Sequence, residues 1–87
     1  MWHIYILQCK DKTFYTGITT DLKRRVKEHN TSTLGAKYTR GRRPVKLVYT
    51  KTLKNKSAAL KEELRIKQLT RAEKLQFLSF NKIKIRL

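Results

Sequence analysis

Apolar and polar positions alternate over the first twenty residues as they do in a β-hairpin. Aromatic and β-branched side chains dominate residues 2–9, which predicts a strand with Trp2, Ile4 and Ile6 on one face and His3, Tyr5 and Leu7 on the other. The polar stretch at 10–13 predicts a short turn, and residues 14–19 predict a second strand. This spacing indicates two antiparallel strands joined by a tight connection.

A helical period replaces this alternation after Thr20 or Asp21, either of which is a good N-cap. The helix is expected over 22–29, with Leu22 and Val26 facing the core. Arg25 and His29 form a second i, i+4 pair, so they are expected to project together beside that apolar stripe.

The middle of the chain predicts a loop at 31–43, which is rich in Thr, Gly, Arg and Lys, and then a third strand over 45–49. Pro44 is tolerable where this strand begins, because no ladder donor is needed there. Val45, Leu47 and Tyr49 are expected to lie on one side of the strand.

Two more helices are expected in the C-terminal half. Ser57 can cap a helix over 58–69 with Leu60 and Leu64 as its core pair, and Thr70-Arg71-Ala72-Glu73 is a capping-box pattern that opens a third helix. Leu75 and Leu78 are the expected core pair of that third helix. Residues 81–87 alternate cations with apolar residues, which leaves an edge strand, a helix extension and a flexible basic arm open.

The pattern as a whole predicts one small α+β domain over residues 1–80, followed by a basic C-terminal tail at 81–87. Its fold is expected to be a three-stranded antiparallel sheet flanked by three helices. A chain of 87 residues has no room for a separate substrate-recognition domain. The sequence leaves the oligomeric state open.

The charge balance points to a polyanionic partner. There are 22 Lys and Arg residues against 6 Asp and Glu residues, a formal net charge of +16. Self-repulsion of this size weakens the compact state, so a phosphate backbone is the expected partner, with a solvated lysine-rich surface as the alternative. No membrane association is expected, because no strongly apolar helix face accompanies the cations.

The compartment is expected to be the cytoplasm. Cys9 is the single cysteine, whereas a small secreted domain usually carries an even set for disulfides. The first residues also lack the basic start of a signal peptide.

Several catalytic classes are absent from the sequence. It has no glycine-rich phosphate loop, no Cys/His zinc spacing and no Ser-His-Asp set. Six acidic residues are few for a two-metal nuclease, which needs several converging carboxylates. An enzyme acting on phosphates would therefore work with one metal ligand supported by Tyr, Arg and His.

Such a set is present, and here the sequence resembles a known family. His3-Ile4-Tyr5 and Tyr15-Thr16-Gly17 resemble the two half-motifs of the GIY-YIG nuclease domain, with His3 and Thr16 as departures from the pattern. Residues 21–30 resemble the first helix of that family, which places its characteristic Arg at Arg25 and its frequent His at His29. Residues 35–44 and 57–63 are similar to its small stand-alone bacterial branch, the YhbQ-like group. The resemblance covers residues 2 to about 77.

The resemblance implies a metal-dependent DNA endonuclease or phosphodiesterase, using Mg²⁺ or Mn²⁺, in repair or recombination; RNA is also a possible partner. It implies roles for five residues: Glu63 as metal ligand, Arg25 on the scissile phosphate, Tyr5 as general base, Tyr15 in positioning and His29 in tuning Tyr5. For Tyr5 to act as a base its pKa must be lowered by Arg25, the metal or His29, since free tyrosine titrates near 10. Otherwise Tyr5 merely orients the attacking water.

Each role has a plainer alternative. Glu63 can pair with Lys67 at i+4 instead of binding metal, and Glu62 replaces it if the helix register is shifted by one. His29 can be a partly exposed residue near a helix C-terminus. Tyr5 and Tyr15 can be core tyrosines with satisfied hydroxyls.

Further residues are expected to contact the substrate. Gly17 would let the substrate backbone approach the sheet, and Arg24, about 100° around the helix from Arg25, would belong to the phosphate-binding surface. The loop supplies interleaved cations and one aromatic residue, which suit phosphate contacts and base stacking: Lys37, Tyr38, Arg40, Arg42 and Arg43.

Two non-catalytic readings remain beside the enzyme. One is a DNA- or RNA-binding module with the same fold. The other is a ribosome- or RNA-associated basic protein, in which Tyr5, Tyr15, Arg25 and Glu63 would not converge in space.

Overall fold

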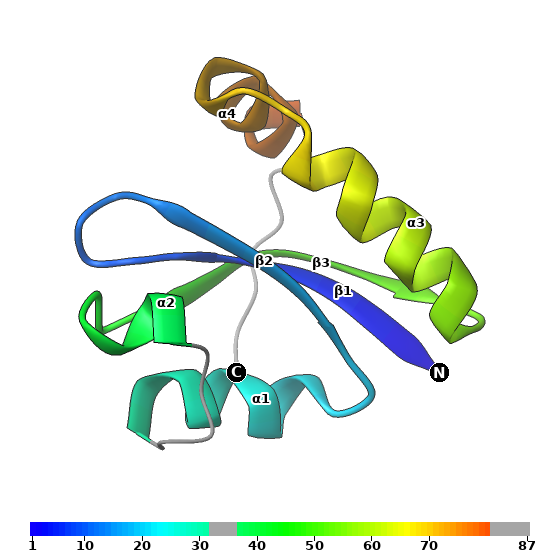
Figure 1. Cartoon of the computed structure of the whole chain (residues 1–87), viewed down its shortest axis with the longest axis horizontal. Coiled ribbons are helices and arrows are strands. Elements are labelled where there is room, and N and C mark those ends of the chain that lie inside the picture. The colour runs from blue at the N-terminus through cyan, green and yellow to red at the C-terminus, as the bar shows by residue number, and fades with distance from the viewer. Residues whose placement is uncertain (32–36, 81–87) are drawn as a thin grey trace.

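The chain forms a three-stranded antiparallel sheet with helices on both of its faces (Figure 1). The computed structural model describes residues 1–31 and 37–80. The strands are β1 (Trp2–Gln8), β2 (Phe14–Thr19) and β3 (Lys46–Leu53), and the helices are α1 (Leu22–Thr31), α2 (Lys37–Arg40), α3 (Lys56–Lys67) and α4 (Arg71–Phe80). The α+β prediction is confirmed, and the predicted tail at 81–87 lies outside the described residues.

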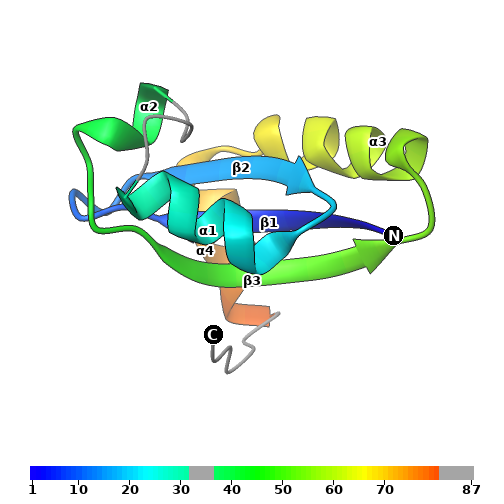
Figure 2. The ribbon, with the colours of Figure 1, turned by 90° about the horizontal axis from the view of Figure 1, so that it is seen from below.

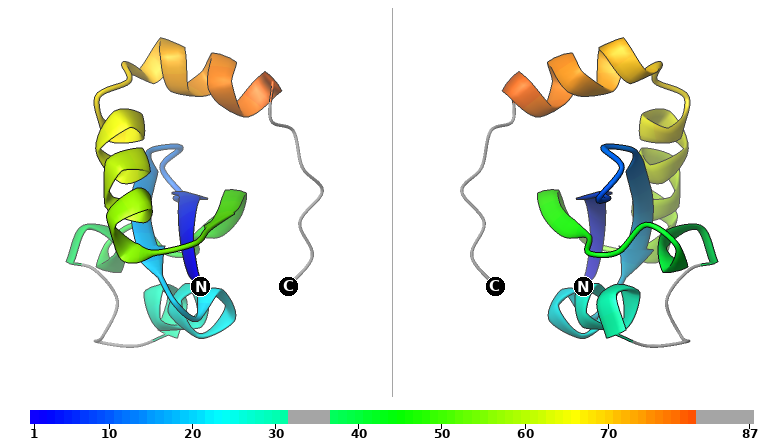
Figure 3. Two further views of the ribbon diagram at one scale, coloured as in Figure 1. Left: turned by 90° about the vertical axis from the view of Figure 1, so that its right-hand side faces the viewer. Right: turned by 90° about the vertical axis from the view of Figure 1, so that its left-hand side faces the viewer.

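Strand β1 lies in the centre of the sheet, in the order β2-β1-β3. Its alternation separates two cores, as predicted: Ile4 and Ile6 pack with Ile66 of α3, whereas Tyr5 and Leu7 pack with residues of α1. Figures 2 and 3 show α1 on one face of the sheet and α3 and α4 on the other.

A register shift in β3 overturns one expectation. Ile6 pairs with Tyr49 but Leu7 pairs with Leu47, so Val48 is an extra residue between two ladder positions. Such a bulge reverses the alternation of side chains along the strand. Val45 and Leu47 therefore pack on the α1 face while Tyr49 packs on the α3 face, and the prediction that all three share one side was wrong.

Helix α1 is fixed at both ends. The Asp21 carboxylate accepts a hydrogen bond from the Arg24 amide at 3.1 Å, which makes Asp21 the N-cap. Leu22 and Val26 pack on the Tyr5 side of the sheet, as expected. At the other end the Asn30 amide exchanges two hydrogen bonds with the backbone of Val45, at 2.8 and 3.0 Å, which ties α1 to the start of β3.

Helix α3 is rotated relative to the prediction. Asn55, not Ser57, is its N-cap, because the side-chain Oδ1 of Asn55 accepts a hydrogen bond from the Ala58 amide at 2.8 Å. Ala59 and Ile66 are the buried residues of α3, while Leu60 and Leu64 are 46% and 60% exposed. The Leu60–Leu64 core pair was therefore wrong: the small Ala59 lets the helix approach the sheet on a different side.

Helix α4 begins with the predicted capping box. The Thr70 amide donates to the Glu73 carboxylate at 2.8 Å, and the Glu73 amide donates to the Thr70 hydroxyl at 3.1 Å. Phe77 and Leu78 pack on the core, whereas Leu75 is 47% exposed, so the expected Leu75–Leu78 pair was half wrong. The edge contact of Phe77 with Tyr49, 4.9 Å between ring centroids, sets this rotation.

The expected loop also contains regular structure. Helix α1 extends to Thr31, and one helical turn, α2, forms at Lys37–Arg40. Within the described residues, no helix has the length and apolar character needed to cross a membrane.

Candidate active site

Strands β1 and β2 bring Tyr5 and Tyr15 onto the α1 face, with their ring centroids 6.3 Å apart. Gly17 is the register partner of Tyr5, and a Cβ atom placed on Gly17 would lie 2.5 Å from the Tyr5 hydroxyl. The absent side chain therefore makes room for the Tyr5 phenol. The space expected for substrate over Gly17 is filled by this ring.

Helix α1 inserts His29 beside the two tyrosines. The His29 ring is fully buried, with Nε2 2.9 Å from the Tyr5 hydroxyl and Nδ1 2.9 Å from the Thr39 hydroxyl of α2. Its centroid lies 5.0 Å from that of Tyr15. The alternative of a partly exposed histidine is wrong, and a chain of hydrogen bonds runs from Tyr5 through His29 to Thr39.

Burial keeps His29 neutral. It lowers the pKa of the imidazole to about 4, assisted by the positive charges of Arg25 and Arg43 and opposed by Glu28. At neutral pH one ring nitrogen therefore carries a proton and the other accepts a hydrogen bond. When the Tyr5 hydroxyl donates to Nε2, Nδ1–H donates to Thr39, and this assignment follows from the hydrogen-bond pattern.

Burial also keeps Tyr5 neutral. It raises the pKa of the phenol to about 12, and the hydrogen bond with Arg25 opposes this rise without cancelling it. The charges of Tyr15 and Glu63 raise the pKa further. The condition that its neighbours lower the pKa of Tyr5 is not met, so Tyr5 stands beside His29 as a neutral phenol.

Arg25 is held at the rim of this cluster. Its Nη1 donates to the Glu28 carboxylate at 3.0 Å, and it also hydrogen-bonds Tyr5. The Arg25 side chain is 26% exposed, whereas the neighbouring Arg24 is 66% exposed and only loosely paired, at 3.8 Å from Glu28 and 4.0 Å from Asp21. The two arginines thus differ as expected, with Arg25 turned inward and Arg24 outward.

Helix α3 supplies Glu63 from the other side of the sheet edge. Its charge acts on the Tyr5 phenol, and its Oε2 also lies 3.4 Å from Lys67 Nζ, the ion pair that was the plainer expectation. Glu62 instead pairs with Lys51 at 3.5 Å and with Arg65, so it joins α3 to β3. Tyr5, Tyr15 and His29 therefore lie together with Arg25 at their rim, and the charge of Glu63 acts on the Tyr5 phenol.

The carboxylate of Glu63 could bind a metal ion that keeps most of its water ligands. Among the described residues no three His, Cys, Asp or Glu side chains are close enough to enclose a metal. Glu63 Oε1 makes no hydrogen bond to any described residue, so this half-buried carboxylate offers one oxygen. Mg²⁺ commonly binds through one or two carboxylates, several waters and the substrate phosphate, and Glu63 fits that pattern.

Two of the loop arginines are engaged within the protein. Arg42 pairs with Asp11 at 3.0 Å and donates to the Tyr38 carbonyl at 2.7 Å, while Arg43 donates to the His29 carbonyl at 2.6 Å. They fasten the α2 segment to the β-hairpin and to α1. Tyr38 and Arg40 are exposed, and the Lys37 side chain lies outside the described part of the chain. Substrate contacts by these residues remain predictions.

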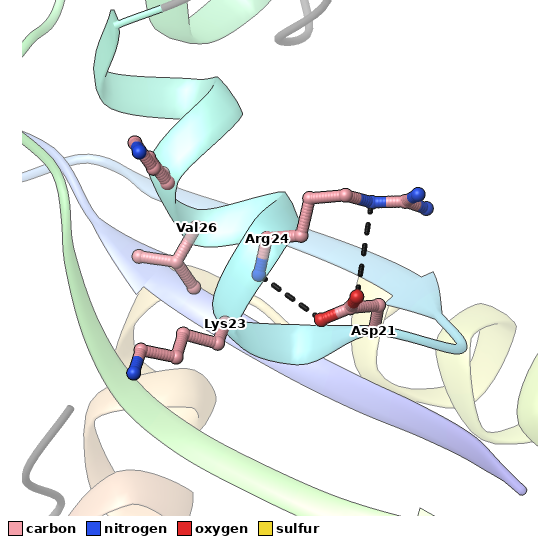
Figure 4. Close-up of a pocket in the computed structure, with 5 residues that line it drawn as sticks. Asp21, Lys23, Arg24 and Val26 are labelled. Carbon is pink, nitrogen blue, oxygen red and sulfur yellow. Dashed lines mark hydrogen bonds and ion pairs between the residues drawn. The ribbon is translucent and has the colours of Figure 1, made fainter.

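A separate pocket of about 590 Å³ lies on the other side of α1 (Figure 4). Lys23, Val26 and Lys27 line it, together with Asp21 and Arg24. Val26 follows Arg25 by one residue and so points about 100° away around the helix. This pocket is therefore distinct from the tyrosine–histidine cluster.

Two members of the cluster were not singled out from the sequence. Thr39 holds Nδ1 of His29, and Glu28 holds Arg25. Glu28 follows Arg25 by three residues on the same helix, so helical spacing signalled that pair. No comparable signal existed for Thr39, because it is ten residues from His29 with no regular period between them.

The chain is similar in sequence to a known protein family and to several small proteins. Residues 1–76 match the family model described as the GIY-YIG catalytic domain. A UPF0213 protein of Halobacterium salinarum is 57% identical over 74 residues, covering 85% of this chain and 95% of that protein. Another, from Syntrophus aciditrophicus, is 51% identical over 79 residues and covers 91% of each.

Two solved structures are also similar. The solution structure of the UPF0213 protein BH0048 from Bacillus halodurans has a TM-score of 0.62 and 47% identity, covering 94% of this chain and 87% of that chain. The protein EF2693 from E. faecalis has a TM-score of 0.62 and 41% identity, covering 98% and 90% respectively.

Proposed function

The chain belongs to the GIY-YIG catalytic-domain family, within the UPF0213 group of small stand-alone proteins, and from that premise we propose that it is a metal-dependent DNA endonuclease or phosphodiesterase. The observation that carries the proposal is the hydrogen-bonded chain from Tyr5 through His29 to Thr39, with Arg25 against the same phenol. A neutral proton path next to a phosphate-binding cation is the arrangement that phosphodiester hydrolysis needs.

Arg25 binds the scissile phosphate. A guanidinium offers planar paired donors to phosphate oxygens, and it stabilises the charge that builds on them in the transition state. Its present partner Glu28 accepts a hydrogen bond from the guanidinium at 3.0 Å. Tyr15, within 5.0 Å of the His29 ring, orients the phosphate or the attacking water.

Tyr5 passes a proton on without becoming a phenolate. The attacking water transfers its proton to the Tyr5 oxygen while the phenolic proton moves to Nε2 of His29, which becomes an imidazolium. Because Tyr5 remains neutral, its pKa of about 12 does not prevent this role. The oxygen of the water bonds to phosphorus and the bond to the 3′ oxygen breaks. The leaving 3′ oxygen takes a proton from solvent water and His29 returns its extra proton to solvent, so a 5′-phosphate and a 3′-hydroxyl result.

Substrate binding prepares His29 for this step. The positive charge of Arg25 is one cause of the low pKa of His29, so a phosphate that neutralises Arg25 raises that pKa. Thr39 stabilises the resulting imidazolium, because its hydroxyl accepts the hydrogen bond from Nδ1–H.

Glu63 would hold the divalent metal, Mg²⁺ or Mn²⁺. When bound, the metal supplies positive charge to the phosphate and to the leaving oxygen. The half-buried position of Glu63 and the effect of its charge on the pKa of Tyr5 support this assignment.

The substrate is proposed to be DNA in repair or recombination. The net charge of +16 supports a nucleic-acid partner, and Arg24, Lys37, Tyr38, Arg40, Arg42 and Arg43 are the proposed substrate contacts. The ion pairs Arg25–Glu28 and Glu63–Lys67 favour a second candidate, a non-catalytic DNA- or RNA-binding module, because both functional groups already have protein partners.

A cleavage assay separates these candidates. The purified protein is incubated with labelled single-stranded, duplex and branched DNA in Mg²⁺, in Mn²⁺ and in EDTA. The enzyme predicts metal-dependent products with 5′-phosphate ends, and the binding module predicts retention of DNA without products under every condition. Complete absence of cleavage with tight, salt-sensitive binding would reject the catalytic proposal.

A further inference from the structure

A second binding surface lies at the edge of the sheet, next to the cluster. Strand β2 is an outer strand, and α2 and α4 lie on either side of the β1–β2 hairpin near its turn (Figure 1). Between them is a pocket of about 220 Å³ lined by Thr13, Phe14, Tyr38, Arg71 and Lys74. The proposed reaction uses only Tyr38 of these residues.

The pocket combines aromatic rings with two cations that form no ion pair with the described acidic side chains. Arg71 lies 5.6 Å from the Phe14 ring centroid, and its Nη1 donates to the Lys12 carbonyl at 3.0 Å. Among the described residues, no carboxylate forms an ion pair with Arg71 or Lys74. These two cations therefore remain available to a phosphate.

Tyr38 is held in place within this pocket. Arg42 stacks on its ring at 4.1 Å and is itself fixed by Asp11. A ring held by its neighbours loses little conformational entropy when a ligand binds against it. Tyr38 is 39% exposed, so part of the ring faces solvent.

The pocket continues directly from the catalytic cluster. The Tyr38 ring is 6.0 Å from Tyr15, which is 5.0 Å from His29. Phe14 precedes Tyr15 on β2 but packs on the opposite face of the sheet. A chain of nucleotides bound at Arg25 would therefore pass over the β2 edge to reach Arg71 and Lys74.

We infer that this pocket binds an unpaired nucleotide beside the scissile phosphate, so that the protein engages single-stranded DNA. A base can stack on an aromatic side chain only when its face is free, and in a duplex both faces are covered by neighbouring base pairs. Arg71 and Lys74 bind the adjoining phosphates. The inference rests on the proposed function for the position of the scissile phosphate.

The test measures binding in EDTA, so that cleavage plays no part. Fluorescence anisotropy compares a labelled ten-nucleotide thymidine strand, a hairpin duplex, and a ten-unit strand of abasic sites with the same phosphates. The variant Arg71→Gln/Lys74→Gln is compared with Lys54→Gln/Lys61→Gln, which removes the same charge from the turn before α3 and from α3 itself.

The pocket variant is expected to lose about tenfold in affinity for the thymidine strand at about 100 mM salt, with a salt dependence reduced by one to two phosphate contacts. The control variant is expected to lose at most about threefold, because it changes only the net charge. The abasic strand is expected to bind about fivefold or more weakly than the thymidine strand, through loss of stacking.

Equal losses in the two variants, equal binding of the thymidine and abasic strands, or tighter binding of the duplex would each overturn the inference. Amide chemical shifts of Phe14, Tyr38 and Arg71 on adding the thymidine strand give a second readout on the unmodified protein, and absence of such shifts at saturation would also overturn it. If the protein cleaves DNA but the pocket variant binds the thymidine strand as the control variant does, only this inference is rejected. If the pocket variant loses affinity as expected but the protein does not cleave DNA, only the proposed nuclease activity is rejected.

Discussion

At the scale of single residues, the central feature is a pair of ionisable groups that burial holds neutral. Burial raises the pKa of Tyr5 to about 12 and lowers that of His29 to about 4, so the two shifts move in opposite directions for one physical cause. The 2.9 Å contact between Tyr5 and His29 therefore joins a neutral phenol to a neutral imidazole. A proton can move along this contact without creating a buried phenolate.

The low pKa of His29 makes the stability of the protein depend on pH. In the unfolded chain His29 binds a proton as the pH falls below its ordinary pKa of about 6.5. In the folded chain the same ring binds a proton only near pH 4. The free energy of unfolding is therefore expected to fall as pH drops through this window, by up to about 3 kcal/mol for His29. Urea unfolding at several pH values measures the slope.

His29→Gln is the control for this prediction. Its pH dependence should be shallower than that of the wild type, while Asp11 and Glu73, whose pKa values are also lowered, contribute equally to both. Direct titration of the His29 ring by NMR gives an independent value. A ring that titrates near 6.5 in the folded protein would contradict the account.

Gly17 gives a second test at this scale. In Gly17→Ala the new Cβ would lie 2.5 Å from the Tyr5 hydroxyl, so the phenol must leave its position against His29. The expected cost is about 1–3 kcal/mol of the free energy of unfolding, as for overpacking elsewhere, together with loss of cleavage. Gly41→Ala is the matched control, because no atom of the described residues lies within 4 Å of its Cβ position. Equal stability of the two variants would show that Tyr5 does not need Gly17.

The sequence motif named the residues of this cluster but not their protonation states. Tyr5, Tyr15 and His29 lie together and the charge of Arg25 acts on Tyr5, while the catalytic roles of these residues stay predictions. The direction of the Tyr5 pKa shift could not be predicted, because it depends on how completely α1 covers the ring. Thr39 was missed since its contact spans two elements with no shared period.

At the scale of elements, short capping and clamping contacts position the cluster. Asp21 begins α1, Asn30 fixes its end to Val45, and Arg43 donates to the His29 carbonyl. These contacts hold His29 over the sheet. The bulge at Val48 lets β3 contribute to both cores.

The cap of α3 is testable with neighbouring residues. Asn55→Ala should lower the free energy of unfolding by about 1 kcal/mol, because the Ala58 amide loses its partner. Ser57→Ala should not lower it, since Ser57 already lies inside the helix, where alanine is favoured. Chemical denaturation of both variants measures these changes. A larger loss of unfolding free energy in Ser57→Ala than in Asn55→Ala would support Ser57 as the N-cap, as the sequence predicted.

Local patterns predicted where elements lie better than how they rotate. The alternation in β1 and the Thr70–Glu73 capping box were read correctly, because each depends on residues close in sequence. The rotation of α3 was not, because leucine spacing competes with the close approach allowed by Ala59. The face of Tyr49 was also wrong, since a bulge has no signature in a run of apolar residues.

At the scale of the whole molecule, some of the excess cationic residues bind other parts of the protein and others lie at a surface pocket. Arg42 and Arg43 are engaged with Asp11 and with backbone carbonyls, whereas Arg71 and Lys74 flank the pocket at the sheet edge. Composition alone predicted a polyanionic partner but could not make this division. To distinguish the two sets of cations, one must know which oxygen atoms the fold brings to each of them.

The proposed catalytic roles of Arg25 and Glu63 are tested most directly by comparing each residue with its chain neighbour of the same type. The charges of Arg25 and Glu63 act on the Tyr5 phenol, whereas their chain neighbours Arg24 and Glu62 pair with other residues. Single-turnover cleavage of labelled DNA is measured for the four alanine variants in saturating Mg²⁺, with folding checked by circular dichroism.

We expect Arg25→Ala and Glu63→Ala each to lose about a hundredfold or more in rate. Arg24→Ala and Glu62→Ala should stay within about tenfold of the wild type, as for groups outside the transition-state contacts. Wild-type rates in Arg25→Ala and Glu63→Ala would contradict the proposed roles of both residues.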